Sequence, residues 1–541
     1  MYTQNLNPTG TLTVSALLAL VPLLAVLVLL GGLRWKAHWA GLVALALAWV
    51  VAIAGYGMPV SAAIHAGLFG VAQSVLLVLW ITFNAIWIYN LTVHSGHFAV
   101  LRRAFSSVSD DARVQGIAIA FCFGALLEAL AGGGGPVAIC SVMLIALGVA
   151  PMKAAALSLV ADTAPVAFGG LGNPVTALGI ITGLPVDDFG KMAGRQVSLL
   201  AALVPFVLVY IADGRRGLRE AWPAALVAGV SFGVTQFLVS NYLSYKLCDI
   251  IAAIVSAGVL LVFLQVWKGG GSTRRAHASG AHRPSPSPSP SGDEVDSRGA
   301  ILAAFAPYGI VVVVFSLAQL EAVKAVLKRA SWSMAWPGLS IFGANGKPVS
   351  TTYVFGIGSA TGTLLMLAGI VSLFVLRVHP VTAIRIYGRT IRQFGWAILA
   401  IVAVFGLSYV MNLSGQIATL GSWLAGAGPF FAFLSPLVGW FGVTITGTDV
   451  GSNTLLGGSQ MAAAHQLGAS PILFGAANGS GGVMAKMISP QNLAVGTAAV
   501  GLVGKEGELF RRVFGWSMLL LFFMCVLVYL QSTPILGWMV P

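Results

Sequence analysis

Apolar runs of about 20 residues recur from one end of the chain to the other. A run of this length crosses a hydrocarbon core of about 30 Å as a helix. The pattern predicts an all-α polytopic membrane protein of about 12 to 14 helices, with re-entrant hairpins near two glycine-rich regions. The expected spans lie near Leu12 to Leu33, His38 to Gly55, Gly70 to Val93, Gln115 to Ala131, Lys153 to Phe168, Gln196 to Asp213, Trp222 to Ser240, Lys246 to Trp267, Ala300 to Leu320, Tyr353 to Leu376, Gln393 to Asn412, Pro429 to Ile445, Pro471 to Met487 and Val513 to Gln531.

The composition excludes a water-soluble fold. Of the 541 residues, 57% are hydrophobic and 8% are charged, and the mean hydropathy is +0.90. Soluble domains carry about 25% charged residues. All four cysteines lie inside apolar runs, where a lone thiol behaves as a small hydrophobic group, so we expect neither a disulfide framework nor a cysteine metal site. The run from Leu12 to Leu33 is too long for the apolar core of a signal peptide and is expected to be a retained helix.

The formal net charge of +13 comes from Lys and Arg residues placed between apolar runs. This distribution indicates membrane topology and not nucleic-acid binding, because basic loops remain in the cytoplasm. Contact with anionic lipid headgroups is a secondary interpretation for the central loop. Both chain termini are then external, and so is the stretch from Glu321 to Pro348, although its basic residues conflict with that position. The segments placed in the cytoplasm contain Arg34 and Lys36, Arg102 to Arg113, Arg215 to Arg219, Lys268 to Arg298, Arg377 to Arg392, and Lys505 to Arg512.

The stretch from Lys268 to Arg298 is rich in Gly, Ser and Pro and includes a Pro-Ser repeat. Such a composition cannot form a packed core and predicts a disordered cytoplasmic linker at 268–299, for which a spacer role is favoured over partner binding. The linker separates an N-terminal membrane repeat, 1–267, from a C-terminal membrane repeat, 300–541.

Each repeat contains a glycine-rich cassette, 128–179 in the first and 446–496 in the second. The first is entered from a basic loop and the second from an uncharged loop, so the two run in opposite directions. Two inverted repeats of this kind provide alternating access in transporters. The cassettes share, weakly, an acidic residue (Glu128, Asp449), a glycine-rich break, a Gly-x-x-Pro turn (Gly148 to Pro151, Gly468 to Pro471), a polar residue (Asp162, Asn478) and a polar-Pro pair (Asn173-Pro174, Ser489-Pro490).

Glycine clusters in both cassettes, Gly132 to Gly135 and Gly479 to Gly482, favour broken or re-entrant backbone. Such backbone persists in a membrane only where protein buries it or where it lines a wet cavity. The amides at half-helix N-termini would then cradle an anion. For any single glycine, close helix packing is the favoured alternative. For the whole clusters with their polar neighbours, we favour a substrate site.

Four ionisable residues lie within the apolar parts of the cassettes: Glu128, Asp162, Asp449 and Lys486. An ionisable side chain near the bilayer centre costs roughly 2.5 kcal/mol or more, so each is a functional candidate. Desolvation favours a protonated carboxyl group, which makes the three acids candidates for proton coupling. Lys486 is the candidate for binding a substrate carboxylate. Structural pairing, for example of Lys486 with Asp449, is the alternative.

Uncharged polar side chains complete the candidate substrate-binding site. They supply donors and acceptors for a hydroxy-carboxylate, while hydrogen bonding between helices is an equally favoured role for any one of them. The candidates are Asn453, Asn478, Ser480, Ser489, Gln491, Thr163 and Asn173.

Several runs resemble the L-lactate permease family: GALLEALAGGGGPVAI (Gly124 to Ile139), ADTAPVAFG (Ala161 to Gly169), TGTDVGSNTLL, the run from Ala476 to Val495, and GLVGKEGELFR (Gly501 to Arg511). The resemblance spans nearly the whole chain, and KMISPQ (Lys486 to Gln491) is quite specific. It implies a bacterial inner-membrane proton symporter of lactate and glycolate without a cofactor, built on paired re-entrant hairpins with elevator-like motion, often as a homodimer. The functional residues that it favours are Glu128, Asp449, Asn453, Asn478, Lys486, Ser489 and Gln491.

The chain departs from the family's pattern at three places. Gly133-Gly134 stands where Phe-Gly is more usual, Asp162 stands where Asn is usual, and Asn173-Pro174 replaces a more apolar pair. The extra carboxylate would alter proton coupling or substrate size, so the transport class is better supported than the substrate.

Other classes of protein remain as alternatives. The main one is a sodium- or proton-coupled carrier for another organic anion, or a cation exchanger that uses the three acids, although Lys486 argues against a bare cation site. An enzyme is disfavoured because the eight histidines lack metal-ligand spacing and the chain has no nucleophile elbow or P-loop. A channel is disfavoured by broken cassettes of opposite orientation, which suit an occluded carrier.

Overall fold

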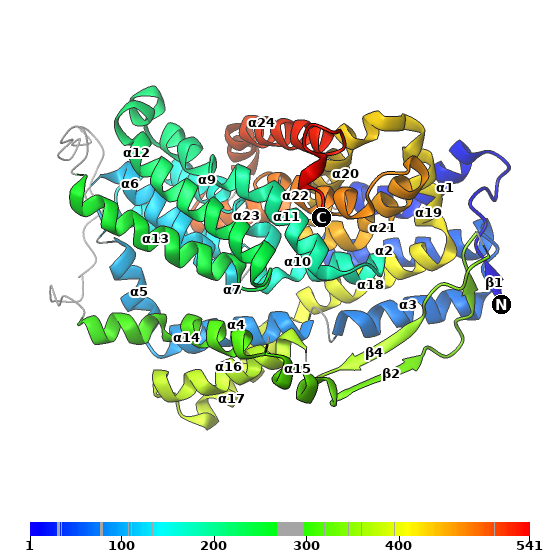
Figure 1. The fold of residues 1–541 in the computed structure, drawn as a ribbon, viewed down its shortest axis with the longest axis horizontal. Coiled ribbons are helices and arrows are strands. Elements are labelled where there is room, and N and C mark those ends of the chain that lie inside the picture. The colour runs from blue at the N-terminus through cyan, green and yellow to red at the C-terminus, as the bar shows by residue number, and fades with distance from the viewer. Residues whose placement is uncertain are drawn as a thin grey trace.

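The computed structural model describes residues 1–541 with the exception of 30–32, 34, 76–78, 107, 110, 131–133, 268–296, 319, 345, 359, 394 and 503. Most of the predicted linker, together with Gly132 and Gly133, therefore lies outside the described residues. Helices make up most of the described structure, and the short strands gather at one end (Figure 1).

The helices are α1 (Leu12–Leu27), α2 (Ala37–Val50), α3 (Val60–Ser74), α4 (Trp80–His94), α5 (His97–Ser106), α6 (Ala112–Gly116), α7 (Gly124–Leu130), α8 (Gly135–Ala146), α9 (Pro151–Ala161), α10 (Gly169–Thr182), α11 (Val186–Ala201), α12 (Val204–Tyr242), α13 (Cys248–Val266), α14 (Arg298–Leu317), α15 (Glu321–Lys328), α16 (Thr361–Leu376), α17 (Pro380–Gln393), α18 (Gly395–Ser414), α19 (Gln416–Leu424), α20 (Phe431–Thr446), α21 (Asp449–Leu467), α22 (Pro471–Lys486), α23 (Pro490–Ala499) and α24 (Glu506–Gln531). Segments Val51–Gly55 and Ile117–Phe123 are π-helical, and Val166–Phe168, Ala425–Phe430 and Gly537–Met539 form 3-10 turns. The strands are β1 (Tyr2–Thr3), β2 (Ser331–Ala335), β3 (Ile341–Phe342) and β4 (Thr352–Gly356).

Long apolar helices confirm the all-α polytopic class. Within the described residues, seven helical segments are long and apolar enough to cross a membrane, and an eighth results if the bent pair Pro151–Ala161 and Val166–Thr182, at 59°, is one span. Shorter apolar helices such as Thr361–Leu376 accompany them. Large apolar side chains are exposed, for example Phe374 at 80% and Val262 at 63%, as a surface that faces lipid requires.

The N-terminus and the segment after α15 lie together at one end of the molecule (Figure 1). β1 pairs in parallel with β3, with Tyr2 opposite Ile341, and β2 pairs antiparallel with β4. The N-terminus therefore lies beside β3, inside the stretch from Glu321 to Pro348. The side of the membrane that these segments face stays a prediction. Helices α5, α6 and α17, which carry some of the predicted cytoplasmic arginines, lie toward the opposite end (Figure 1).

Each cassette folds as a helical hairpin followed by a third helix: α8, α9 and α10 in the first, and α21, α22 and α23 in the second. Gly148 (φ +89°) and Gly468 (φ +64°) follow the first helix of each hairpin in left-handed backbone, which glycine adopts without a steric cost. Pro151 and Pro471 open the second helices, where the missing N–H is not needed. The weak sequence similarity thus corresponds to the same local structure.

The two glycine clusters have different roles. In the first cassette, Gly134 (φ +87°) precedes α8 and non-helical backbone at Gly170–Gly172 interrupts α10, as expected for broken helices. In the second cassette, α22 is continuous, so the predicted break at Gly479 to Gly482 is wrong. A Cβ on Gly481 would overlap the backbone of Pro436 on α20. The glycine there permits close packing of two helices.

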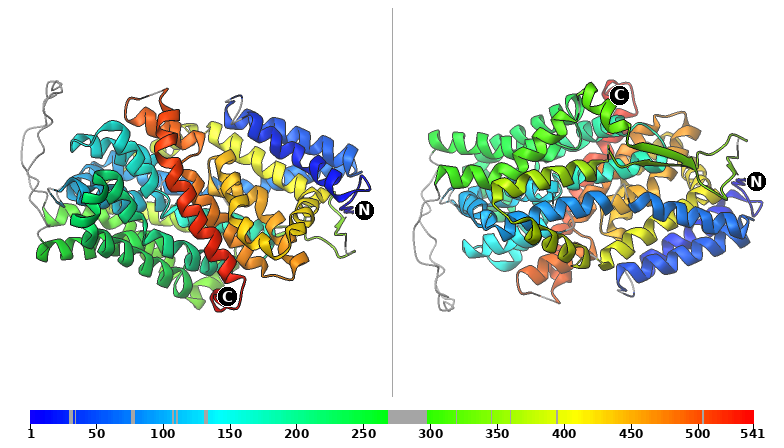
Figure 2. Two further views of the ribbon diagram at one scale, coloured as in Figure 1. Left: turned by 90° about the horizontal axis from the view of Figure 1, so that it is seen from above. Right: turned by 90° about the horizontal axis from the view of Figure 1, so that it is seen from below.

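The third helix of each cassette packs against the hairpin of the other cassette. α10 contacts α21 and α22, while α23 contacts α8 and α9. α24 crosses the molecule between the two groups of helices and contacts both α9 and α20 (Figure 2). The exchange of third helices joins the cassettes into one unit, and their inverted relationship stays a prediction.

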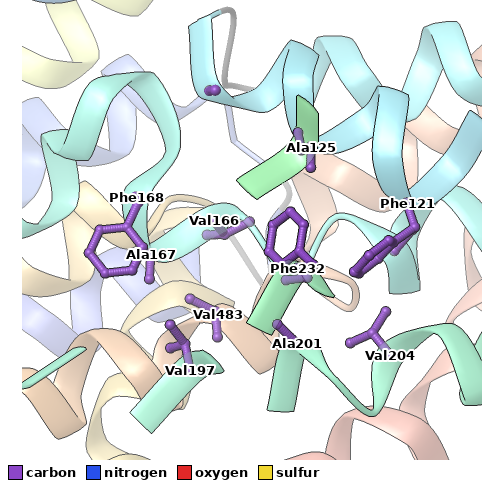
Figure 3. Packing of buried hydrophobic residues seen from close by; sticks show 14 of the residues in the cluster. Phe121, Ala125, Val166, Ala167, Phe168, Val197, Ala201, Val204, Phe232 and Val483 are labelled. Atoms are coloured by element: carbon purple, nitrogen blue, oxygen red, sulfur yellow. The ribbon is translucent and has the colours of Figure 1, made fainter. Parts of the chain in front are cut away.

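A large apolar core holds the first cassette in place (Figure 3). The rings of Phe121 and Phe232 lie 4.9 Å apart between centroids. Val166 and Phe168, on the turn between α9 and α10, are buried in the same cluster as Val483 of α22. Close packing of this kind fixes the turn between α9 and α10, next to which the candidate site lies.

Candidate functional site

A buried lysine between two carboxylates forms the centre of the candidate site. Lys486 is the last residue of α22, and its Nζ donates to Oε1 of Glu128 at 2.5 Å and lies 3.0 Å from Oδ2 of Asp162. Glu128 comes from α7 and Asp162 directly follows α9. All three residues are 3 to 4% exposed. We call them the lysine triad; it joins the second cassette to the first.

The backbone of α10 breaks beside Glu128. A Cβ on Gly169 would lie 2.9 Å from Oε1 of Glu128, so a larger residue there would require the carboxylate to shift. The following residues, Gly170 to Gly172, all have left-handed backbone, with φ of +53°, +56° and +73°. The middle one is the fully buried Leu171, for which this backbone costs about 1 to 2 kcal/mol. Strain of this kind concentrates at functional sites.

A series of amide side chains connects the two cassettes beside this break. Nδ2 of Asn453 on α21 donates to the carbonyl of Pro174 on α10 at 3.1 Å, and its Oδ1 accepts from Nδ2 of Asn478 at 2.8 Å. Oδ1 of Asn478 accepts from Nε2 of Gln460 at 3.3 Å. The structure brings together two predicted residues, Asn453 and Asn478, and here their amides serve as hydrogen bonds between helices. Gln460 was not predicted.

Asp449 lies at the N-terminus of α21 and is 3% exposed. Neither of its carboxylate oxygens has a hydrogen-bond partner within the described part of the chain. A Cβ on Gly482 would lie 2.6 Å from Oδ1 of Asp449, so a glycine of α22 makes space for this carboxylate. The alternative pairing with Lys486 is not formed, because that side chain is held in the lysine triad.

Two further predicted residues are engaged in local structure. Ser489 caps α23: its Oγ accepts from the N–H of Asn492 at 3.4 Å and donates to the carbonyl of Lys486 at 3.1 Å. Oγ1 of Thr163 donates to the carbonyl of Val160 at 2.7 Å. In this conformation both hydroxyl groups stabilise helix ends.

The remaining predicted polar residues lie in different environments. Ser480 and Asn173 are buried, and Oγ of Ser480 and Oδ1 of Asn173 have no hydrogen-bond partner among the described residues. Gln491 is exposed at the start of α23, with its Oε1 near Gly447. Ser480 and Asn173 therefore retain polar atoms that a ligand can use, whereas Gln491 lies at the surface.

The sequence analysis missed Asp249. It lies in the first turn of α13, is 1% exposed, and its Oδ1 accepts from Nε2 of Gln236 at 3.1 Å. Glu128 and Lys486 both act on it electrostatically. An acidic residue inside the apolar run from Lys246 to Trp267 was the available signal, but that run lies outside both cassettes.

The buried charges determine what the site can do. Among the described residues, four buried carboxyl groups, those of Glu128, Asp162, Asp249 and Asp449, accompany the single buried lysine of this region, Lys486. If all four were ionised, the acids would exceed the lysine by 4 − 1 = 3 charges, at a cost of several kcal/mol for each uncompensated charge. Protons or another cation must therefore neutralise some of them.

A metal ion finds no ready position in the lysine triad, because Lys486 already lies between Glu128 and Asp162. In the part of the chain that the structure describes, no group of three or more His, Cys, Asp or Glu side chains is arranged to hold one. The chemistry available is the binding of protons by the carboxylates and of an anion by the ammonium group.

The chain is similar to known permeases over its whole length. The family model described as L-lactate permease matches residues 15–535. The chain is 40% identical to the glycolate permease GlcA of Escherichia coli (strain K12), covering 100% of this chain and 99% of the relative. It is 38% identical to the L-lactate permease of Bacillus subtilis (strain 168), and 36% identical to that of Escherichia coli (strain K12), with 100% of each chain covered. A solved structure, the YdaH transporter of Alcanivorax borkumensis, is 15% identical with a TM-score of 0.43, covering 85% of this chain and 86% of the other.

Proposed function

Because this chain belongs to the L-lactate permease family, and is thus a multi-pass transporter of the bacterial inner membrane and not an enzyme, we propose that it carries small 2-hydroxy monocarboxylates together with protons. L-lactate and glycolate are the substrates that the names of its relatives support. D-lactate carries the same carboxylate and 2-hydroxyl group. The observation that carries the proposal is the lysine triad, in which one ammonium group and two carboxylates are buried together.

Competition for Lys486 would couple the proton to the substrate. Its ammonium group is already held by Glu128 and Asp162, so a substrate carboxylate gains little unless one of these acids loses its charge. A proton on either acid neutralises it and frees the ammonium group for the anion. Proton and anion then bind together, which is the requirement for symport. Asp449, which lacks a partner within the described residues, is the other candidate for the proton.

Buried polar groups on α10, α21 and α22 would recognise the 2-hydroxyl group. Ser480 and Asn173 offer buried polar atoms without partners in the described structure, and Asn453 and Asn478 can exchange their mutual hydrogen bond for one to the substrate. Such an exchange costs little if the ligand replaces each bond that it breaks. Contacts from Ser489, Gln491 and Thr163, the other predicted residues, require a different conformation of the helix ends.

The two cassettes would provide alternating access. Their hairpins share the same turn, and each gives its third helix to the other, which supports a pair of related repeats. If the repeats are inverted, exchange of their conformations opens the site first to one side and then to the other. The homodimer that the resemblance implies is a separate proposal, for which the mass of the solubilised protein is the test.

Uptake into proteoliposomes tests the proposed function. Labelled L-lactate or glycolate is offered without sodium under an imposed acid-outside gradient, with the membrane potential clamped at zero. Symport of one proton with one monovalent anion predicts about tenfold accumulation for each pH unit, since one pH unit corresponds to 1.36 kcal/mol. Lys486→Met should abolish uptake, whereas the control Arg512→Gln, which changes a side chain 51% exposed, should preserve it.

The same proteoliposomes, with a sodium gradient in place of the pH gradient or with a metal ion in place of the anion, test the alternatives. Sodium-driven uptake in the absence of a pH gradient would favour a sodium-coupled carrier. A failure to accumulate any 2-hydroxy acid, with proton-driven movement of a metal ion, would favour a cation exchanger and reject our proposal. The position of Lys486 between two carboxylates favours the anion carrier.

A further inference from the structure

Asp249 lies beside the lysine triad but has no cation of its own. It is 1% exposed, and its Oδ2 has no hydrogen-bond partner within the described residues. Its Oδ1 accepts one bond, from Nε2 of Gln236 on α12. An ionised carboxylate accepts several hydrogen bonds in a favourable site, so this environment is poor in partners for the charged form.

A hydrogen-bond bridge connects Asp249 to the triad. Nε2 of Gln236 also donates to the carbonyl of Ala164 at 3.2 Å, two residues after Asp162 on the same turn. α13, which carries Asp249, packs against α7, which carries Glu128. Asp249 is therefore linked through Gln236 to the turn that carries Asp162, and its helix packs against the helix that carries Glu128.

Few ionisable groups face Asp249. Glu128 on α7 and Lys486 on α22 act on it electrostatically. The thiol of Cys248, its neighbour on α13, contacts the carbonyl of Gln236 at 3.1 Å, and the segment Ile117–Phe123 contributes Cys122, whose Sγ lies 3.5 Å from Oγ of Ser256 farther along α13. α10 has no Asp, Glu, Lys, Arg, His, Cys or Tyr, and α12 contacts Asp249 through Gln236.

Charge balance connects this group to transport. A substrate anion adds one negative charge to this region, where Lys486 is the only lysine that is buried among the described residues. The negative charge of an ionised Asp249 would then be uncompensated beside the substrate and the triad. Protonation removes that charge, so substrate binding and proton binding at Asp249 favour one another.

We propose that Asp249 is a further proton-coupling residue of this carrier, which is neutral while the substrate anion is bound and ionises in the substrate-free state. The proposal rests on the proton-anion symport described above. It adds a carboxylate outside both cassettes, on the α12–α13 pair, to the residues that link pH to transport. Asp249 acts through the charge of the site and need not touch the substrate.

Asp249→Asn, which is always neutral, separates coupling from binding. Exchange of labelled for unlabelled L-lactate at equal pH on both sides should remain within about twofold of wild type, because the substrate-bound state has a neutral residue 249 in both proteins. With the proton at Asp249 added to the one in the proposed function, the wild type should accumulate L-lactate about a hundredfold per pH unit, and Asp249→Asn only about tenfold, the contribution of the one proton that remains coupled. The affinity for L-lactate should also decline less steeply as the pH is raised. Glu508→Gln, which alters a surface acid 41% exposed, is the matched control.

Different results would reject the role of Asp249 and the proposed function. Unchanged accumulation and an unchanged pH profile in Asp249→Asn would overturn the inference, and so would loss of exchange in a protein that remains folded. If Asp249→Asn does not fold, Gln236→Leu, which keeps the carboxyl group but removes its hydrogen bond, should shift the pH at which affinity declines; an unshifted profile would overturn the inference. A wild-type protein that does not accumulate lactate would instead reject the proposed function itself.

Discussion

Replacing Lys486 by methionine should destabilise the folded protein by about 3 to 5 kcal/mol near pH 7.5, the cost of removing one partner from a buried ion pair. The structure explains why the change should lower the stability. The ammonium group lies 2.5 Å from Oε1 of Glu128 and 3.0 Å from Oδ2 of Asp162, and none of the three residues is more than 4% exposed. Methionine keeps most of the packing volume, so the loss reports on charge.

Without the lysine, the carboxylates of Glu128 and Asp162 lose their unfavourable buried charge only by binding protons. The penalty of Lys486→Met should therefore shrink as the pH is lowered. Adding Glu128→Gln removes one of the uncompensated charges, so the double variant should be more stable than the sum of the two single changes predicts. We expect an interaction energy of about 1 to 3 kcal/mol, the range for residues in one ion-pair network.

Unfolding in detergent micelles measures this cycle. Denaturant titrations followed by the fluorescence of the 14 tryptophans give the unfolding free energy of each variant at two pH values. Arg512→Gln, at an exposed ion pair, should change it by less than about 0.5 kcal/mol. The assignment of a charged, mutually dependent triad would be refuted if the losses of unfolding free energy in Lys486→Met and Glu128→Gln added to that of the double variant within about 0.5 kcal/mol and did not depend on pH.

Two further predictions concern packing and acid stability. Gly439→Ala should lower the melting temperature and reduce transport, because the new Cβ would overlap the backbone of Asn478. The control Gly507→Ala, whose Cβ would have no atom within 4 Å, should leave both unchanged. A Gly439→Ala variant with unchanged melting temperature and transport would contradict the close contact. Burial alone would raise the pKa of Asp111, but its bonds to Arg113 outweigh this and hold that pKa below the usual value. The ionised form therefore stabilises the fold above about pH 3.9, and this stabilisation is lost as the pH falls further. In acid titrations the wild type should be more stable than Asp111→Asn near neutral pH, and this difference in stability should disappear at low pH. A difference that persists at low pH would contradict the lowered pKa of Asp111.

Features that depend on local sequence were predictable. The apolar runs gave the helical class, and the Gly-x-x-Pro motifs at Gly148 and Gly468 gave the hairpin turns, because left-handed glycine and a helix-opening proline act within a few residues. The same criterion of charge inside an apolar run selected Glu128, Asp162 and Lys486, which the structure brings together.

Features that depend on partners far along the chain were not predictable. Glu128 and Lys486 are separated by 358 positions, so no local pattern indicates that they pair, or that Asp449 remains apart. The role of Gly481 depends on Pro436 of a neighbouring helix, and the same residue type serves a break in one cassette and close packing in the other. Asp249 also lies inside an apolar run, but only the tertiary packing of α13 against α7 shows that it lies near the triad.

The most direct test of proton-anion coupling is the number of protons that the solubilised protein takes up when L-lactate binds. A pH indicator in weakly buffered solution measures this number from about pH 8.5 to about pH 5.5. We predict uptake of at least about one proton per bound anion at the alkaline end, because a carboxylate must be neutralised before Lys486 can bind the substrate, and a decline toward zero as the carboxylates are protonated in advance. Binding of L-lactate with no proton uptake at any pH would contradict the proposed mechanism.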